Sequence, residues 1–120
     1  MVKENKILDV TFNFALQIIE LYKLLQQRNE FVISKQLLRS ATSIGANAEE
    51  GNAAQTKKDF ISKMSMASKE ARETKYWLRL LQKSQLVPND YTQHLLAIEH
   101  IINILTRIVK TSKESLVNAK

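Results

Sequence analysis

Cysteine is absent from this chain, which also holds a single proline and only two glycines. Without cysteine, neither a disulfide framework nor a thiolate metal site can form. The scarcity of proline and glycine argues against a β-rich fold with many turns. The residue types that remain abundant, such as leucine, alanine, lysine and glutamine, favour helices.

Long apolar runs are missing as well. No segment approaches the ~18 consecutive apolar residues of a membrane span, and the opening residues, MVKENKILDV, are too polar for a signal peptide. We therefore expect a cytoplasmic protein with no membrane partner.

The length of 120 residues favours one domain that spans residues 1–120. Apolar residues recur at helical spacing in four segments, at about residues 9–27, 32–50, 57–83 and 90–113. The connections between them are short, so neighbouring helices should run antiparallel. These patterns predict an all-α, up-down-up-down antiparallel four-helix bundle, with a tail after Lys113 that frays.

Each segment carries an apolar stripe that should face the core. In the third segment the stripe runs from Phe60 to Leu81 in steps of four and three, as in helices packed at a shallow angle. The second and fourth segments repeat this rhythm. In the first segment the predicted stripe is Leu8, Phe12, Ala15, Ile19 and Tyr22, widened by Phe14, Ile18, Leu21 and Leu25.

The central stretch LLRSATSIGANAEEGNAAQ, residues 37–55, has the composition of a loop. It lacks the Gly-Lys-Ser/Thr ending of a phosphate-binding P-loop, and no predicted strand precedes it. On the second helix, Gly45 would lie beside the apolar stripe and let another helix approach closely, and Gly51 stands where a C-cap glycine is expected. A polar stripe that can donate hydrogen bonds across the contact consists of Gln36, Ser40, Ser43 and Asn47.

We expect no catalytic, cofactor-binding or metal-binding residues. His94 and His100 are six residues apart and point to different sides of a helix, unlike metal ligands spaced by three or four. Glu49 and Glu50 are adjacent and diverge, and no serine lies in a nucleophile elbow. The sequence therefore predicts a protein that is not an enzyme.

Basic residues gather on one side of the third helix. At about 100° per residue, seven of them fall in an arc of roughly 60° to 180° from the core stripe, and the acids fall on the other side. Such a stripe is typical of nucleic-acid binding; a solvated face, or a flank that pairs with the acidic flank of another subunit, fits it as well. The candidate nucleic-acid-binding residues are Lys57, Lys58, Lys69, Arg72, Lys75, Arg79 and Lys83, together with Arg39 on the second helix.

Large apolar residues also lie outside the core stripe of the third helix. Met66, Tyr76, Trp77 and Leu80 form this second group, which includes the only tryptophan. Tryptophan, tyrosine and methionine are enriched at protein interfaces. We therefore expect these residues to form an oligomer interface.

Two motifs carry a resemblance to a known family. The first is QLLRSATSIGANAEEG, residues 36–51, and the second is KKDFISKMSMASKEARETKYWLRLL, residues 57–81. The chain resembles the four-helix-bundle proteins encoded by intervening sequences inside bacterial 23S ribosomal RNA genes, also called S23-type proteins. The matching positions are Gln36, Leu37, Arg39, Ser40, Ser43, Ile44, Asn47, Glu50 and Gly51, then Asp59, Phe60, Ile61, Ala67, Glu70 and Glu73.

The resemblance implies a homo-oligomer, typically a pentamer, whose biochemical role is poorly defined. It also implies kinship with the accessory proteins of diversity-generating retroelements, which are basic pentameric bundles that bind nucleic acid and a reverse transcriptase. It supplies no active site. The partners that we expect are further copies of the chain and ribosomal RNA or another nucleic acid.

Two functions remain open on the sequence. The leading hypothesis is non-catalytic binding of RNA or DNA by an oligomer through its basic face. The alternative is an oligomeric scaffold or adaptor that binds another protein and no nucleic acid.

Overall fold

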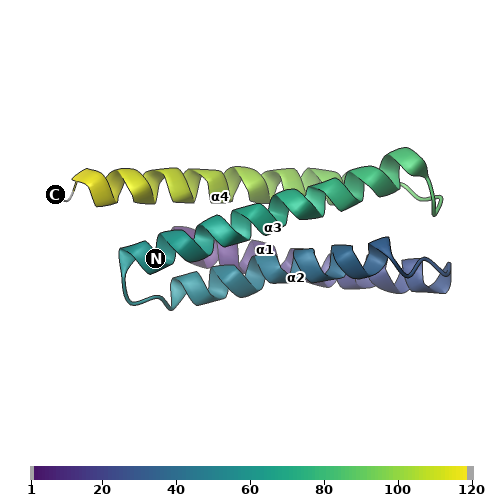
Figure 1. The fold of residues 1–120 in the computed structure, drawn as a ribbon, viewed down its shortest axis with the longest axis horizontal. Helices are drawn as coiled ribbons and strands as arrows, with labels where there is room; N and C mark the ends of the chain where they lie inside the picture. The colour runs from purple at the N-terminus through teal and green to yellow at the C-terminus, as the bar shows by residue number, and fades with distance from the viewer. Residues whose placement is uncertain (1, 119–120) are drawn as a thin grey trace.

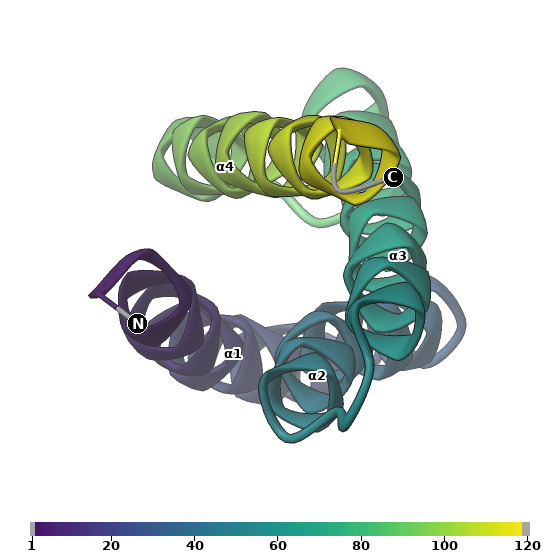
Figure 2. The same cartoon turned by 90° about the vertical axis from the view of Figure 1, so that its left-hand side faces the viewer.

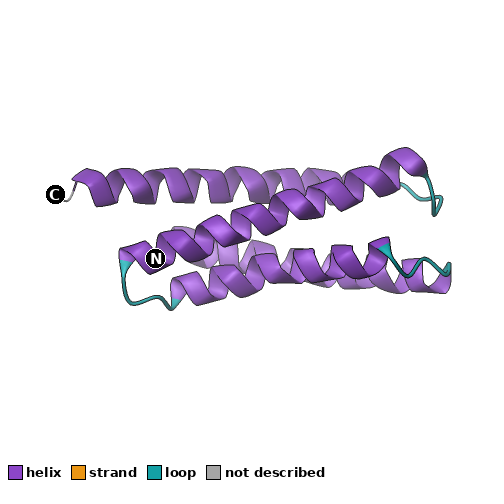
Figure 3. Cartoon of the chain, in the orientation of Figure 1, coloured by secondary structure: helices purple, strands orange, loops and turns teal. Residues whose placement is uncertain are grey.

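The computed structural model describes residues 2–118, which form four helices joined by short connections (Figures 1 and 3). The helices are α1 (Val2–Gln27), α2 (Ile33–Asn52), α3 (Lys57–Ser84) and α4 (Thr92–Asn118). They lie along a common long axis, in an elongated molecule of 53 × 22 × 22 Å. Within the described residues there is no strand.

Each helix packs against the next one in the chain, and α2 and α3 share the most extensive contact. The contact between α1 and α4 is the smallest, so the four helices surround an open C rather than a closed square (Figure 2). The short connections force successive helices to run in opposite directions. The predicted all-α, up-down-up-down bundle is confirmed.

The outer helices are longer than the sequence predicted. Helix α1 begins at Val2 instead of about residue 9, and α4 continues to Asn118 instead of ending near Lys113. The prediction of a frayed tail is wrong for residues 114–118, because the last turns of α4 lie against α3; residues 119–120 lie outside the described part of the chain. There Lys57 donates a hydrogen bond of 2.8 Å to Ser115 Oγ, and Leu116 is partly buried.

Side chains at the helix starts satisfy backbone N–H groups. Thr56 Oγ1 accepts from the N–H of Asp59 at 3.1 Å, and Asp90 Oδ1 accepts from the N–H of Thr92 at 3.0 Å. Threonine and aspartate are among the residue types that favour this position. Helix α2 is capped differently: the buried carboxylate of Glu30 accepts from the N–H groups of Val32, Ile33 and Ser34 at 3.0, 2.9 and 2.6 Å.

The predicted core stripes of α2, α3 and α4 are buried or partly buried, but that of α1 is rotated. Phe14, Ile18, Leu21 and Leu25 face the core, whereas Phe12 is 61% exposed. Phe12 and Phe14 lie ~200° apart around a helix, so both cannot face α2. Because α4 covers little of α1, one stripe of this doubly apolar helix stays at the surface.

The prediction for Gly45 is confirmed, because α1 approaches it closely at Thr11, whereas the prediction for Gly51 is wrong. Gly51 is not a C-cap: it is buried inside α2, and no glycine has a positive φ. A Cβ on Gly51 would lie 3.2 Å from both Lys63 Cβ and Met64 Cε of α3, which is tighter than ordinary contact. A Cβ on Gly45 would lie 3.4 Å from Thr11 Oγ1 of α1, an ordinary contact. The position that demands a small residue is therefore Gly51.

No helix in the described part of the chain combines the length and the apolar character that crossing a membrane requires.

Candidate nucleic-acid interface

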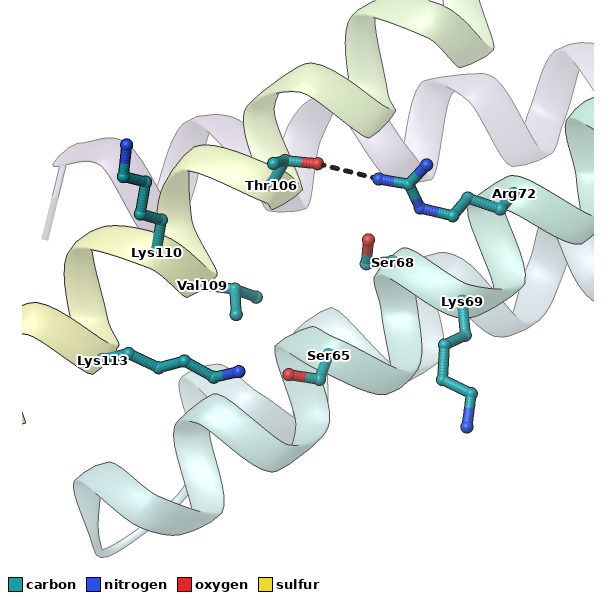
Figure 4. Close-up of a pocket in the computed structure, with 8 residues that line it drawn as sticks. All are labelled: Ser65, Ser68, Lys69, Arg72, Thr106, Val109, Lys110 and Lys113. Atoms are coloured by element: carbon teal, nitrogen blue, oxygen red, sulfur yellow. Dashed lines mark hydrogen bonds between the residues drawn. The ribbon is translucent and has the colours of Figure 1, made fainter.

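An open groove of about 410 Å³ runs between α3 and α4 (Figure 4). Four cationic side chains and three hydroxyls line it, with a valine between them, and no Asp or Glu is among the described residues of its lining. The lining residues are Ser65, Ser68, Lys69 and Arg72 of α3, and Thr106, Val109, Lys110 and Lys113 of α4. A concave surface lined by charge of one sign attracts counter-charged ligands more strongly than a flat one.

The cations occupy both the interior and the rims of this groove. Arg72 reaches across it and donates a hydrogen bond of 3.3 Å to Thr106 Oγ1. In Figure 4, Lys113 points from α4 towards Ser65 on α3, while Lys69 and Lys110 point outward from opposite helices. Positive charge thus lies on both helices that border the groove, and Arg72 bridges them.

The structure brings only part of the predicted basic stripe to this groove. Lys69 and Arg72 line it. Lys75 instead forms an ion pair of 2.6 Å with Glu99 of α4, and Lys57 bonds to Ser115. The remaining members of the stripe on α3, Lys58, Arg79 and Lys83, are exposed.

Arg39 was also a candidate, but it lies in a different environment. Its guanidinium pairs with the carboxylates of Glu70, at 3.4 Å, and Glu73, and so joins α2 to α3. The hydrogen bond to Glu73 raises the pKa of Arg39. Trp77 Nε1 donates to Glu73 at 3.0 Å, and this bond together with Arg39 lowers the pKa of Glu73. Because the guanidinium of Arg39 is already paired with two carboxylates, Arg39 is not part of the candidate interface.

Lys110 and Lys113 were not among the binding residues predicted from the sequence. Their signal was present, because Arg107, Lys110 and Lys113 recur every three residues in the last segment. The antiparallel packing of α3 and α4 then places these lysines opposite the first half of α3.

The residues that carry the family resemblance lie mainly between α2 and α3. The buried hydroxyls of Ser40 and Thr74 lie 2.8 Å apart across this contact, and Glu50 forms an ion pair of 2.8 Å with Lys63. The other members of the predicted polar stripe stay within α2: Ser43 bonds to the carbonyl of Arg39, and Asn47 to that of Ser43. The motifs thus encode the pairing of two helices.

The predicted oligomer-interface residues differ in exposure. Met66 and Tyr76 are 44% and 52% exposed, whereas Trp77 and Leu80 are partly buried. Trp77 packs against the core and against the edge of the Tyr76 ring, with a centroid distance of 5.1 Å. Contacts within the single chain therefore already bury much of the Trp77 side chain.

Among the described residues, no three His, Asp or Glu side chains lie close enough together to hold a metal ion. His94 is largely buried, and its Nδ1 has no hydrogen-bond partner within the part of the chain that the structure describes. Burial lowers the pKa of His94, and the nearby Asp90 offsets part of this effect.

Comparison with known proteins identifies the family. Residues 3–107 match the family model described as 23S rRNA-intervening sequence protein. A crystal structure of a protein of unknown function from the S23 ribosomal protein family of Bacteroides thetaiotaomicron is 44% identical. The match covers 90% of this chain and 98% of that one, with a TM-score of 0.84. No curated protein matches the chain. The chain belongs to the family of 23S rRNA-intervening sequence proteins.

Proposed function

We propose that this protein is a non-catalytic oligomeric bundle that binds RNA or DNA through the basic face of α3. The observation that supports this proposal is the groove beside that face, whose described lining residues include four cations and no Asp or Glu. Each lysine or arginine that neutralises a phosphate releases condensed counterions, which supplies binding energy irrespective of base sequence.

Lysines dominate the face, and they act as flexible point charges rather than as bidentate readers of base edges. We therefore expect binding that tolerates many sequences and depends strongly on salt. The test is fluorescence anisotropy of a labelled structured RNA and a labelled DNA duplex at roughly 50 and 200 mM salt. Affinity that falls steeply with salt supports the proposal, and no binding at the lower salt concentration contradicts it.

We also propose that the chain assembles into a homopentamer, as the family resemblance implies. The exposure of Met66 and Tyr76 on α3 supports self-association. Substitutions at these two residues should disturb the fold of the single chain less than a substitution at Trp77, because Trp77 bonds to Glu73. Light scattering coupled to gel filtration should show five chains for the wild type and fewer for Met66→Lys with Tyr76→Lys. A matched double variant on α1, Phe12→Lys with Leu16→Lys, tests the other exposed apolar stripe.

A protein-binding scaffold is the second candidate, and a separate observation favours it. Phe12 and Leu96 are each 61% exposed, and Val32 at one end of the bundle is 74% exposed. Apolar surface of this kind is typical of contacts with other proteins. A partner protein whose binding survives high salt, in the absence of any affinity for nucleic acid, would favour this function over the first.

A further inference from the structure

We infer that the phosphodiester backbone of a bound polynucleotide lies in the groove between α3 and α4, with Lys110 and Lys113 as its second wall. This inference rests on the proposed function and gives it a defined site. It replaces the one-helix stripe of the sequence analysis with a site that two helices build.

The first argument concerns which charges are available. Lys75, towards one end of the groove region, is neutralised by Glu99 of α4, whereas Lys57 at the other end bonds to the neutral hydroxyl of Ser115. Between them, Lys69, Lys110 and Lys113 form none of the ion pairs found within the described residues, and Arg72 bonds only to a neutral hydroxyl. Among the described residues, the groove thus brings together four cations that have no carboxylate partner, whereas Lys75 beside it is neutralised by Glu99.

The second argument concerns the hydroxyls. Ser65 and Ser68 are partly buried on the α3 wall, and Thr106 is exposed on the α4 wall. Hydroxyl groups donate hydrogen bonds to phosphate oxygens and, with Lys and Arg, are among the usual backbone contacts of nucleic-acid-binding proteins. Figure 4 shows Ser68 pointing into the space between the two helices, towards the side where Arg72 reaches Thr106.

The third argument concerns size. On each helix the lining spans eight residues, Ser65 to Arg72 and Thr106 to Lys113, or ~10 Å between the first and the last at the helical rise. That length matches about three phosphates at the ~3.4 Å axial spacing of one strand in a duplex. Four cations are sufficient to neutralise them.

Two other hollows lack this character. The one beside His94 is lined by neutral side chains of α1 and α4. The one at the end of the bundle contains one arginine and one glutamate, and its other lining residues are mostly apolar. Neither offers the net positive charge that a phosphate chain requires.

The test compares two double variants that remove equal charge. Lys110→Gln with Lys113→Gln removes the α4 wall, and Lys58→Gln with Lys83→Gln removes two exposed lysines of α3 outside the groove lining. With labelled duplex DNA, the groove variant should lower the slope of log K against log salt by about 1.8 and weaken binding by roughly 50-fold at 0.1 M salt. The control pair should change both quantities much less.

A third variant separates shape from charge. Ser68→Leu fills the groove while the net charge stays the same, and leucine is a good helix former. We expect weaker binding with an unchanged far-ultraviolet circular dichroism spectrum. Full affinity in Ser68→Leu would overturn the inference.

The outcomes separate the two proposals. If the wild type binds and both lysine pairs weaken binding equally, the phosphates do not lie in the groove, and only the general basic face remains. If the wild type does not bind RNA or DNA at 50 mM salt, the proposed function and the groove inference both fail.

Discussion

Replacing Arg39 with methionine should destabilise the bundle and leave nucleic-acid binding intact. Replacing Arg72 with methionine should weaken nucleic-acid binding and leave the stability of the bundle nearly unchanged. Both arginines belonged to the basic set predicted from the sequence, but the structure places them differently. Arg39 pairs with Glu70 and Glu73 across the α2–α3 contact. Arg72 lines the groove and bonds only to the Thr106 hydroxyl.

The magnitude follows from exposure. The side chain of Arg39 is 49% exposed, and those of Glu70 and Glu73 are 27% and 34% exposed. Partly solvated ion pairs contribute up to ~1 kcal/mol. After the substitution, Glu73 keeps its bond from Trp77, and Glu70, which loses the guanidinium, is 27% exposed and can be solvated by water. We expect a loss of ~1 kcal/mol in the free energy of unfolding, or about 4 °C in Tm for a chain of this length.

The assay joins thermal unfolding to anisotropy titration over a range of salt concentrations, at one fixed protein concentration because self-association shifts Tm. For Arg72→Met we expect a Tm within ~2 °C of the wild type and a salt slope on duplex DNA that is smaller by about 0.9. For Arg39→Met we expect an unchanged slope. A reduced slope with an unchanged Tm in Arg39→Met would refute the assignment.

Three further predictions concern the fold. Gly45→Ala should raise the free energy of unfolding by up to ~1 kcal/mol, because the added Cβ makes only ordinary contact with Thr11; Gly51→Ala should gain less or lose stability, because Lys63 and Met64 must move. Urea unfolding of the two variants measures this difference, and an equal gain in both would contradict it. Ser40→Ala and Thr74→Val should show a coupling energy of about 0.5–1.5 kcal/mol in a double-mutant cycle, because both remove one buried hydrogen bond; additive effects would argue against that bond. Because the pKa of His94 is lowered in the folded chain, the unfolded chain binds a proton there at higher pH, so the free energy of unfolding should fall as pH drops below ~6.5. His94→Gln should flatten this pH dependence, whereas His100→Gln, at an exposed histidine, serves as the control. An unchanged pH profile in His94→Gln would show that another group is responsible.

Much of the fold was predictable from particular residues. The steps of three and four in α2, α3 and α4 identified buried stripes, and Thr56 and Asp90, which are residue types that favour helix caps, stand at the starts of two helices. In α1, both sides of the helix are apolar, and periodicity cannot say which side meets a neighbour. The small α1–α4 contact decided that Phe12 stays at the surface.

The candidate site was less predictable, because it depends on which residues meet across helices. The charge arc on α3 was visible along one segment, and so were its members Lys69 and Arg72. The residues that meet these side chains from other helices were not visible in the sequence. Glu99 pairs with Lys75, two carboxylates pair with Arg39, and Lys110 and Lys113 complete the groove.

The sequence by itself determined the helices, their antiparallel order and the family, because these depend on local periodicity, short connections and a string of motif residues. The tertiary structure alone decided which glycine is confined, which face of α1 is buried and which cations are unneutralised. These depend on distances between residues remote in the chain, such as the 2.6 Å between Lys75 and Glu99, and no one-dimensional pattern contains such distances.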